Sequence, residues 1–107
     1  MGNPEVLLYE KKGRVAVITF NRPELNFANG EMLNKLMVAL KDAEEDQNVR
    51  CVVIMSAGEK AFSGGIDLKY LRTLNKDGQV KFAELVRDVA YRIARLKKPT
   101  IAAVHGY

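Results

Sequence analysis

The chain has 107 residues, of which 48% are hydrophobic and 28% charged, a balance typical of one small globular domain. The net charge of +4 suits an anionic ligand bearing phosphates, and it also suits weak attraction to nucleic acid or an ordinary solvated surface. No apolar run approaches the roughly 20 residues that a membrane span needs, and the N-terminus lacks a signal-peptide pattern.

Two β-rich runs open the chain, at residues 6–11 and 14–20. Lys12-Gly13 between them predicts a hairpin turn. Asn21-Arg-Pro23 ends the second run, because proline lacks the N–H that a strand donates to its neighbour.

A helix is predicted over residues 31–46, where apolar residues recur at helical spacing and charged residues lie opposite. Asn29 is a candidate cap for its first turn. We interpret the acidic run at residues 42–46 as a solvated face and end of this helix.

A buried strand is predicted at residues 51–55. The single cysteine, Cys51, lies in this run, so a disulfide framework is excluded and a buried structural thiol is favoured over a nucleophile. A chain without disulfides fits a reducing, cytoplasmic compartment.

A loop with three glycines follows this strand and leads to a short helix at residues 67–73. Residues 75–78 then break the chain, and a second long helix is predicted over residues 79–96. Its apolar stripe reads as ordinary core. Pro99 ends it, and residues 100–104 form another buried strand.

The order of elements predicts an α/β fold in one domain. Each of the two buried strands follows a helix, which indicates parallel neighbours in the sheet. Two substantial helices are few for a sheet of at least four strands, because a parallel sheet usually buries both faces. We therefore expect residues 1–107 to be the front portion of a longer fold.

The glycine-containing loop, residues 57–69, is the candidate site. Glycines at a strand-to-helix junction allow close approach to the backbone, and the first helical turn has unpaired N–H groups. Such a junction offers main-chain donors to an oxygen carrying negative charge. An ordinary capped βα turn explains the same spacing, whereas the P-loop and dinucleotide-binding fingerprints are absent.

Three motifs resemble the crotonase family, the enoyl-CoA hydratase/isomerase superfamily. They are Asn21-Arg-Pro23, VVIMSAGEKAFSGGIDLKYL at residues 52–71 and KKPTIAAVHGY at residues 97–107. The resemblance covers nearly the whole chain in register and implies the N-terminal part of a crotonase-like (ClpP/crotonase) spiral of ββα units. It also implies binding of acyl-CoA thioesters, whose carbonyl is polarised by two backbone N–H groups.

The resemblance assigns the first of these two donors to the Ile66 N–H. Relatives often have Ala-Gly-Ala-Asp where this chain has Gly64-Gly-Ile-Asp67, so the bulkier Ile66 implies a narrower acyl pocket. Leu25 corresponds to a residue that packs on coenzyme A. The substrate-binding residues implied by the resemblance are Leu25, Gly64, Gly65, Ile66, Asp67, Leu68 and Lys69.

Two further side chains are candidates on residue type alone. His105 stands where many relatives have asparagine, and a hydrogen-bonded structural role is favoured over a base. Ser63 lacks a neighbouring histidine or acid in the sequence, which favours a turn-forming role over a nucleophile.

The resemblance implies a coenzyme A thioester as substrate, no cofactor, no metal, and a homo-trimer or hexamer acting in fatty acid metabolism. The second oxyanion donor and the catalytic carboxylates of the family lie beyond the position of Tyr107, so the reaction type is not readable and we expect residues 1–107 alone to be inactive. The alternatives are a truncated or non-catalytic chain that binds coenzyme A and, as a third class, an RNA-binding member of the family. RNA affinity would fall steeply with salt.

Overall fold

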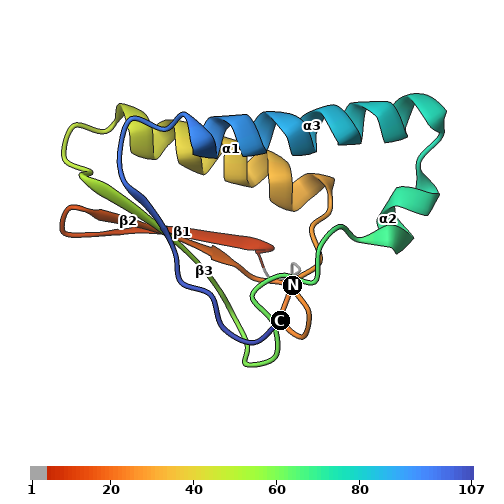
Figure 1. Ribbon diagram of the computed structural model, residues 1–107, viewed down its shortest axis with the longest axis horizontal. Coiled ribbons are helices and arrows are strands. Elements are labelled where there is room, and N and C mark those ends of the chain that lie inside the picture. The colour runs from red at the N-terminus through yellow and green to blue at the C-terminus, as the bar shows by residue number, and fades with distance from the viewer. Residues whose placement is uncertain (1–4) are drawn as a thin grey trace.

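The computed structural model describes residues 5–107, which form one four-stranded sheet and three helices (Figure 1). In chain order the elements are β1 (Leu7–Lys12), β2 (Val15–Phe20), α1 (Gly30–Glu45), β3 (Cys51–Ser56), α2 (Leu68–Thr73), α3 (Lys76–Ala94) and β4 (Thr100–Ala102). All of the predicted elements are present, and the mixed α/β class is confirmed.

The sheet has the strand order β1-β2-β3-β4, in which β1 and β2 are antiparallel and the other two pairs are parallel. The predicted parallel neighbours are therefore confirmed. The hairpin turn lies one residue later than predicted, because Lys12 pairs with Val15 and leaves Gly13-Arg14 as the loop. Gly13 has a φ of +61°, which the first central residue of a type II′ turn requires.

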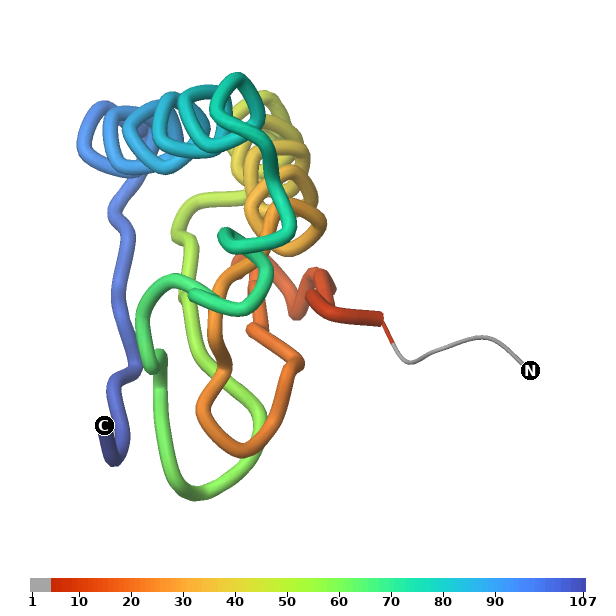
Figure 2. Tube along the Cα trace, turned by 90° about the vertical axis from the view of Figure 1, so that its right-hand side faces the viewer, coloured from red at the N-terminus to blue at the C-terminus, as the bar shows by residue number. Residues whose placement is uncertain are grey.

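Both long helices lie on the same side of the sheet, where α1 packs against α3, and Figure 2 shows them side by side above the strands. The core is formed where alternate strand residues meet the apolar face of α1. Its fully buried members include Ile18, Met32, Leu36, Leu40 and Val52. From α3, Phe82 and Val89 are buried in the same core.

Asparagine caps begin both long helices. The Asn29 side chain accepts a hydrogen bond from the Met32 N–H, as predicted for α1. The start of α3 was predicted too late, because Asn75 accepts from the Gly78 N–H at 2.8 Å and the helix begins at Lys76. Asn75 starts the helix as well as ending the preceding segment, and Gly78 lies in its first turn.

The acidic end of α1 is not simply solvated, as the sequence had suggested. The last turn carries no basic residue of its own, so its acids oppose the negative end of the helix dipole. Cations from elsewhere compensate: Lys11 pairs with Asp42 and Asp46 at 2.8 and 2.7 Å, and Arg92 pairs with Glu44 at 3.3 Å. The end of the helix is thereby tied to β1 and to α3.

Lys98 completes the same helix end. Its ammonium group donates to the Ala43 carbonyl at 2.7 Å and to the Asp46 carbonyl at 2.6 Å. These carbonyls have no partner inside the helix. A residue from the segment before β4 thus caps α1 and fixes where β4 enters the sheet.

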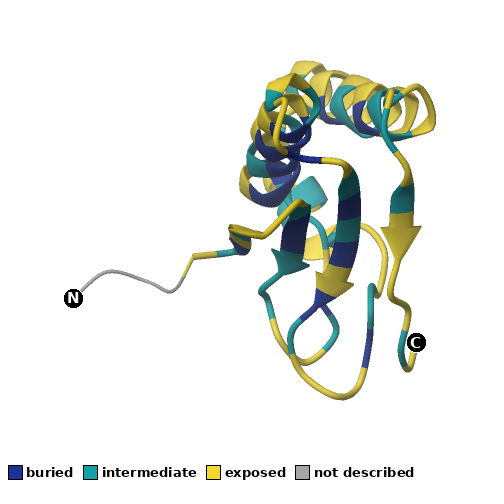
Figure 3. Ribbon diagram, turned by 90° about the vertical axis from the view of Figure 1, so that its left-hand side faces the viewer, coloured by how far each residue is buried: buried dark blue, intermediate teal, exposed yellow. Residues whose placement is uncertain are grey.

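The strand at β4 is exposed, although residues 100–104 were predicted to be buried (Figure 3). Ile101 is 53% exposed and Val104 is 65% exposed. Ile101 pairs with Val53 on the face of the sheet opposite the helices, and no element formed by residues 5–107 covers that face. Cys51 is half-buried rather than buried, because the alternation along β3 places it on the same open face as Val53.

Among residues 5–107, no helix combines the length and the hydropathy that crossing a bilayer requires.

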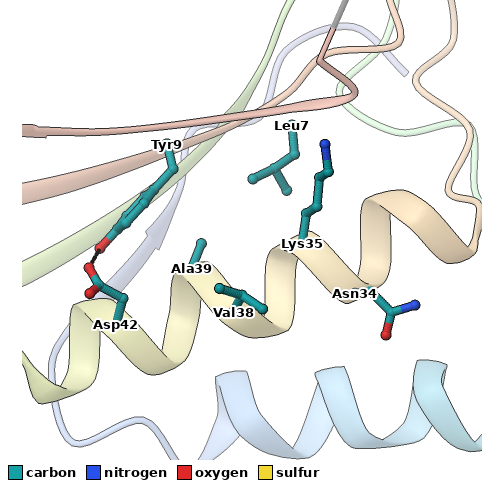
Figure 4. A pocket seen from close by; sticks show the side chains of 7 residues that line it. All are labelled: Leu7, Tyr9, Asn34, Lys35, Val38, Ala39 and Asp42. Carbon is teal, nitrogen blue, oxygen red and sulfur yellow. Dashed lines mark hydrogen bonds between the residues drawn. The ribbon is translucent and has the colours of Figure 1, made fainter.

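Lys11 stabilises the fold in a pH-dependent manner. Its hydrogen bonds lower the pKa of Asp42 and of Asp46, and Tyr9 also donates to Asp42 at 2.7 Å (Figure 4). A lowered carboxyl pKa contributes stability above the ordinary value of 3.8 and loses it as the pH falls through the lowered value. We expect Lys11→Met to lower the melting temperature at pH 7, measured by circular dichroism, and the difference from wild type to shrink in acid. A difference that is constant across pH would contradict this.

The open face of the sheet predicts self-association, since exposed apolar strands pair with other chains. We expect light scattering to show oligomers of the chain at micromolar concentration, and Ile101→Lys to shift the distribution toward monomer. Val38→Lys is the matched control, because Val38 is 70% exposed but lies on α1 near the opposite sheet edge. A monodisperse wild-type monomer would show this expectation to be wrong.

Candidate functional site

The candidate site is built from two loops at one end of the sheet. Residues 21–29 follow β2 and residues 57–67 follow β3, and parallel strands bring both loops to the same edge (Figure 2). The Ala57 N–H donates to the Phe20 carbonyl at 2.8 Å, and the Gly64 N–H donates to the Leu25 carbonyl at 2.6 Å. The two loops therefore form one unit of backbone.

Asn26 joins the loops from inside and was missed by the sequence analysis. Its side chain is fully buried, accepts from the Arg22 N–H at 2.9 Å and donates to the carbonyls of Ala57 and Ala61 at 2.9 and 2.8 Å. Its φ of +51° belongs to a region that asparagine tolerates better than most residues. The turn-rich composition of residues 24–30 was the available signal, and it does not reveal these partners.

Gly64 and Gly65 are required for different reasons. A Cβ on Gly64 would lie 2.7 Å from the Phe27 ring and 2.9 Å from the Leu25 carbonyl oxygen, so only glycine fits. Gly65 meets no such obstacle, but its φ of +96° disfavours any side chain. Together they allow residues 63–67 to pass close to the first loop.

Ile66 lies in a short β-bridge with Ala28. The Ala28 N–H donates to the Gly65 carbonyl at 2.8 Å, and the Asp67 N–H donates to the Ala28 carbonyl at 2.9 Å. Alternate peptide groups of an extended segment point to opposite sides, so the Ile66 N–H is turned away from Ala28. Of the six N–H groups at residues 62–67, it is the one without an acceptor anywhere in the described chain.

An ion pair flanks this donor. Arg22 Nη1 lies 2.9 Å from Asp67 Oδ2 and also donates to the Phe27 carbonyl at 2.7 Å. Asp67 Oδ1 accepts from the Tyr70 N–H, and this bond together with the Arg22 guanidinium holds the pKa of Asp67 below its usual value. The Asp67 carboxylate is therefore occupied as a cap and as an ion-pair partner.

The donor at the site belongs to the loop rather than to a helix. The sequence had suggested that the short helix would aim its free N–H groups and dipole at the ligand. However, α2 has only six residues, and Asp67 caps its first turn. Leu68 and Lys69 extend from this turn with exposed side chains.

Ser63 and His105 have structural contacts in this region. Ser63 Oγ accepts from the Gly65 N–H at 3.1 Å, which agrees with the predicted turn-forming role. The His105 carbonyl accepts from the Phe62 N–H at 3.0 Å, while its Nε2 is buried without a partner among residues 5–107, contrary to the hydrogen-bonded side chain that we expected.

Apolar side chains with exposed surface lie on the two loops that form the bridge at Ile66. Phe27 and Ile66 are each 38% exposed, Leu68 is 60% exposed, and Leu25 is half-buried. Leu25, Phe27 and Arg22 also line a surface cavity of about 560 Å³. The site thus combines one unpaired backbone donor with an apolar rim.

Comparison with known proteins shows the family to which the chain belongs. The family profile described as Enoyl-CoA hydratase/isomerase matches residues 10–107. The chain belongs to the enoyl-CoA hydratase/isomerase family. The resemblance to the crotonase superfamily is thereby confirmed.

The relatives include enzymes of more than one reaction class. The chain is 38% identical over 102 residues to a short-chain-enoyl-CoA hydratase of Clostridium acetobutylicum, covering 94% of the chain and 39% of the relative. It is also 38% identical over 106 residues to the mitochondrial 3-hydroxyisobutyryl-CoA hydrolase of Bos taurus. This match covers 95% of the chain and 27% of the relative.

A solved enoyl-CoA hydratase/isomerase from Xanthobacter autotrophicus Py2 superposes with a TM-score of 0.85 at 40% identity, over 94% of the chain and 39% of that structure. The crotonase-like fold is thus confirmed for a chain that spans about two fifths of the length of this enoyl-CoA hydratase/isomerase.

Replacing Asn26 tests how the two loops are held. Asn26→Ala leaves the Arg22 N–H and two carbonyls without their buried partner, and each unsatisfied group costs about 1–3 kcal/mol. We expect the free energy of unfolding to fall by roughly 3 kcal/mol in urea titrations. Asn26→Gly is the control, because it relieves the positive φ but restores no hydrogen bond. A Gly variant with wild-type stability would show that backbone strain, not the amide, matters.

Proposed function

We propose that this protein is an acyl-CoA enzyme of the enoyl-CoA hydratase/isomerase type, in which the Ile66 N–H is one donor of an oxyanion hole. The observation that carries the proposal is the unpaired Ile66 N–H between two backbone hydrogen bonds that fix its direction. Backbone donors held in place before the substrate arrives cost no reorganisation when charge develops.

The chemistry follows from the thioester. Removing a proton beside the carbonyl, or adding a nucleophile to the conjugated double bond, places negative charge on the carbonyl oxygen as an enolate. A donor about 2.7–3.1 Å from that oxygen stabilises the enolate more than the neutral thioester. Phe27 and Ile66 are each 38% exposed, and a bound acyl-CoA that covers them would remove water near the donor, which strengthens this interaction.

Coenzyme A binding is proposed along the same turn. The residues that we assign to it are Leu25, Gly64, Gly65, Asp67, Leu68 and Lys69. Leu68 offers exposed apolar surface, and the Lys69 ammonium is available to a phosphate. Asp67 contributes by holding the shape of the turn, because its carboxylate is already paired with Arg22.

The remaining parts of the function rest on the family. Relatives are named as hydratases and as a hydrolase, so the proposed class is thioester enolate chemistry rather than one reaction. We propose that the second donor and the acid or base are supplied by structure equivalent to the rest of these relatives. A cytoplasmic homo-trimer or hexamer acting in fatty acid metabolism, with coenzyme A thioester as substrate and not as cofactor, completes the proposal.

Ile66→Pro tests the donor directly. Proline removes the N–H, and no intramolecular hydrogen bond is lost because that N–H has no acceptor. A dimethylaminocinnamoyl-CoA thioester changes its absorption when its carbonyl is polarised, so we expect a red shift on binding to wild type that Ile66→Pro abolishes. In a full-length enzyme that carries the second donor and the acid or base, turnover of an enoyl-CoA should fall about 100- to 1000-fold.

Ile66→Ala is the matched control, since it keeps the N–H and should keep the red shift. The affinity for coenzyme A itself should change little in either variant, because we assign its nucleotide end to Gly64, Leu68 and Lys69 and not to the Ile66 N–H. If folded Ile66→Pro polarises the thioester as well as Ile66→Ala does, the assignment of this donor is wrong. Binding without any polarisation in wild type would favour the non-catalytic alternative.

A further inference from the structure

The Asn21-Arg-Pro23 motif provides a charge that the proposed chemistry does not itself use. Arg22 is two-thirds buried, and the side chain of its partner Asp67 is only 13% exposed. Arg22 reaches across from the first loop, and its Nη1 atom contacts both the Asp67 carboxylate and the Phe27 carbonyl. Phe27 and Asp67 are the residues that flank the Ala28–Ile66 bridge.

We infer that the Arg22–Asp67 pair is the positioning element of the Ile66 donor, an inference that rests on the proposed function. The pair joins the two strands of the bridge just outside its two hydrogen bonds. A bridge of a single residue pair has no neighbouring ladder to hold it. The ion pair supplies that support and so fixes the direction of the Ile66 N–H.

The pair also has an electrostatic consequence at the donor. Asp67 directly follows Ile66, and an uncompensated carboxylate there would oppose negative charge on a thioester oxygen. Arg22 neutralises this carboxylate at 2.9 Å in a largely dry setting. The same carboxylate caps α2 through the Tyr70 N–H, so the donor and the helix start move as one body.

Two variants separate these roles. Asp67→Asn removes the charge and the ion pair but keeps an oxygen that can cap the Tyr70 N–H. Arg22→Met removes the guanidinium at similar length and leaves the carboxylate uncompensated. Asp88→Asn is the control, because it breaks the Arg87–Asp88 pair at 3.2 Å on the exposed side of α3.

Amide hydrogen exchange, read amide by amide by NMR, tests the positioning without any ligand. In Asp67→Asn and in Arg22→Met we expect exchange at the Ala28 and Asp67 amides to quicken about tenfold, while Val52 in the core is unchanged. Tyr70 should stay protected in Asp67→Asn. Asp88→Asn should match wild type. Wild-type exchange at Ala28 and Asp67 in both variants would overturn the inference.

The dimethylaminocinnamoyl-CoA red shift tests the consequence for the site. We expect a larger loss of red shift in Arg22→Met than in Asp67→Asn, and partial recovery in the double variant. A double variant no better than Arg22→Met would overturn the electrostatic part. If wild type itself shows no red shift, the proposed function fails, and the exchange result still decides whether the pair positions the bridge.

Discussion

The site depends on one buried amide, the side chain of Asn26. It receives a hydrogen bond from its own loop and donates two to the loop after β3, which lies more than thirty residues later in the chain. A buried polar group is stable only when its hydrogen bonds are made, so the two loops have one mutual arrangement. The Gly64–Leu25 bond, the Ala28–Ile66 bridge and the Arg22–Asp67 pair all require that arrangement.

The residues of the family motifs have different structural roles in this arrangement. The glycines at positions 64 and 65 allow close approach, and Asp67 caps a helix while it holds a cation. None of these contacts uses the Ile66 N–H. Within residues 62–67, every backbone N–H except the donor that the proposed chemistry requires therefore has an acceptor in the described chain.

Sequence patterns predicted the features that depend on residues close together in the chain. Alternating and helical apolar residues placed every element, and the Asn29 cap was visible because its partner is three residues away. Asn75 shows the limit, since the same residue type both breaks a chain and starts a helix, and only packing decides. The exposure of β4 was not predicted, because burial depends on what covers a strand and not on its own sequence.

For the candidate site, too, the sequence indicated the segment but not the contacts within it. The resemblance of motifs indicated Ile66 and its turn. It could not indicate the direction of the Ile66 N–H, which depends on the folded backbone. Asn26 and Arg22 escaped notice as parts of the site because their partners are distant in sequence or are backbone atoms, which carry no residue type. The sequence thus proposed the loop, and the structure shows the contacts within it.

The cap on α1 has a consequence for the order in which the protein is made. Lys98 satisfies carbonyls of Ala43 and Asp46, more than fifty residues earlier in the chain. During synthesis Lys11 and α1 emerge long before Lys98 leaves the ribosome, so the Lys11 pairs at the end of α1 can form first and the Lys98 bonds only later. The two Lys98 bonds are therefore added together with the entry of β4 into the sheet, after the whole of α1 has been synthesised.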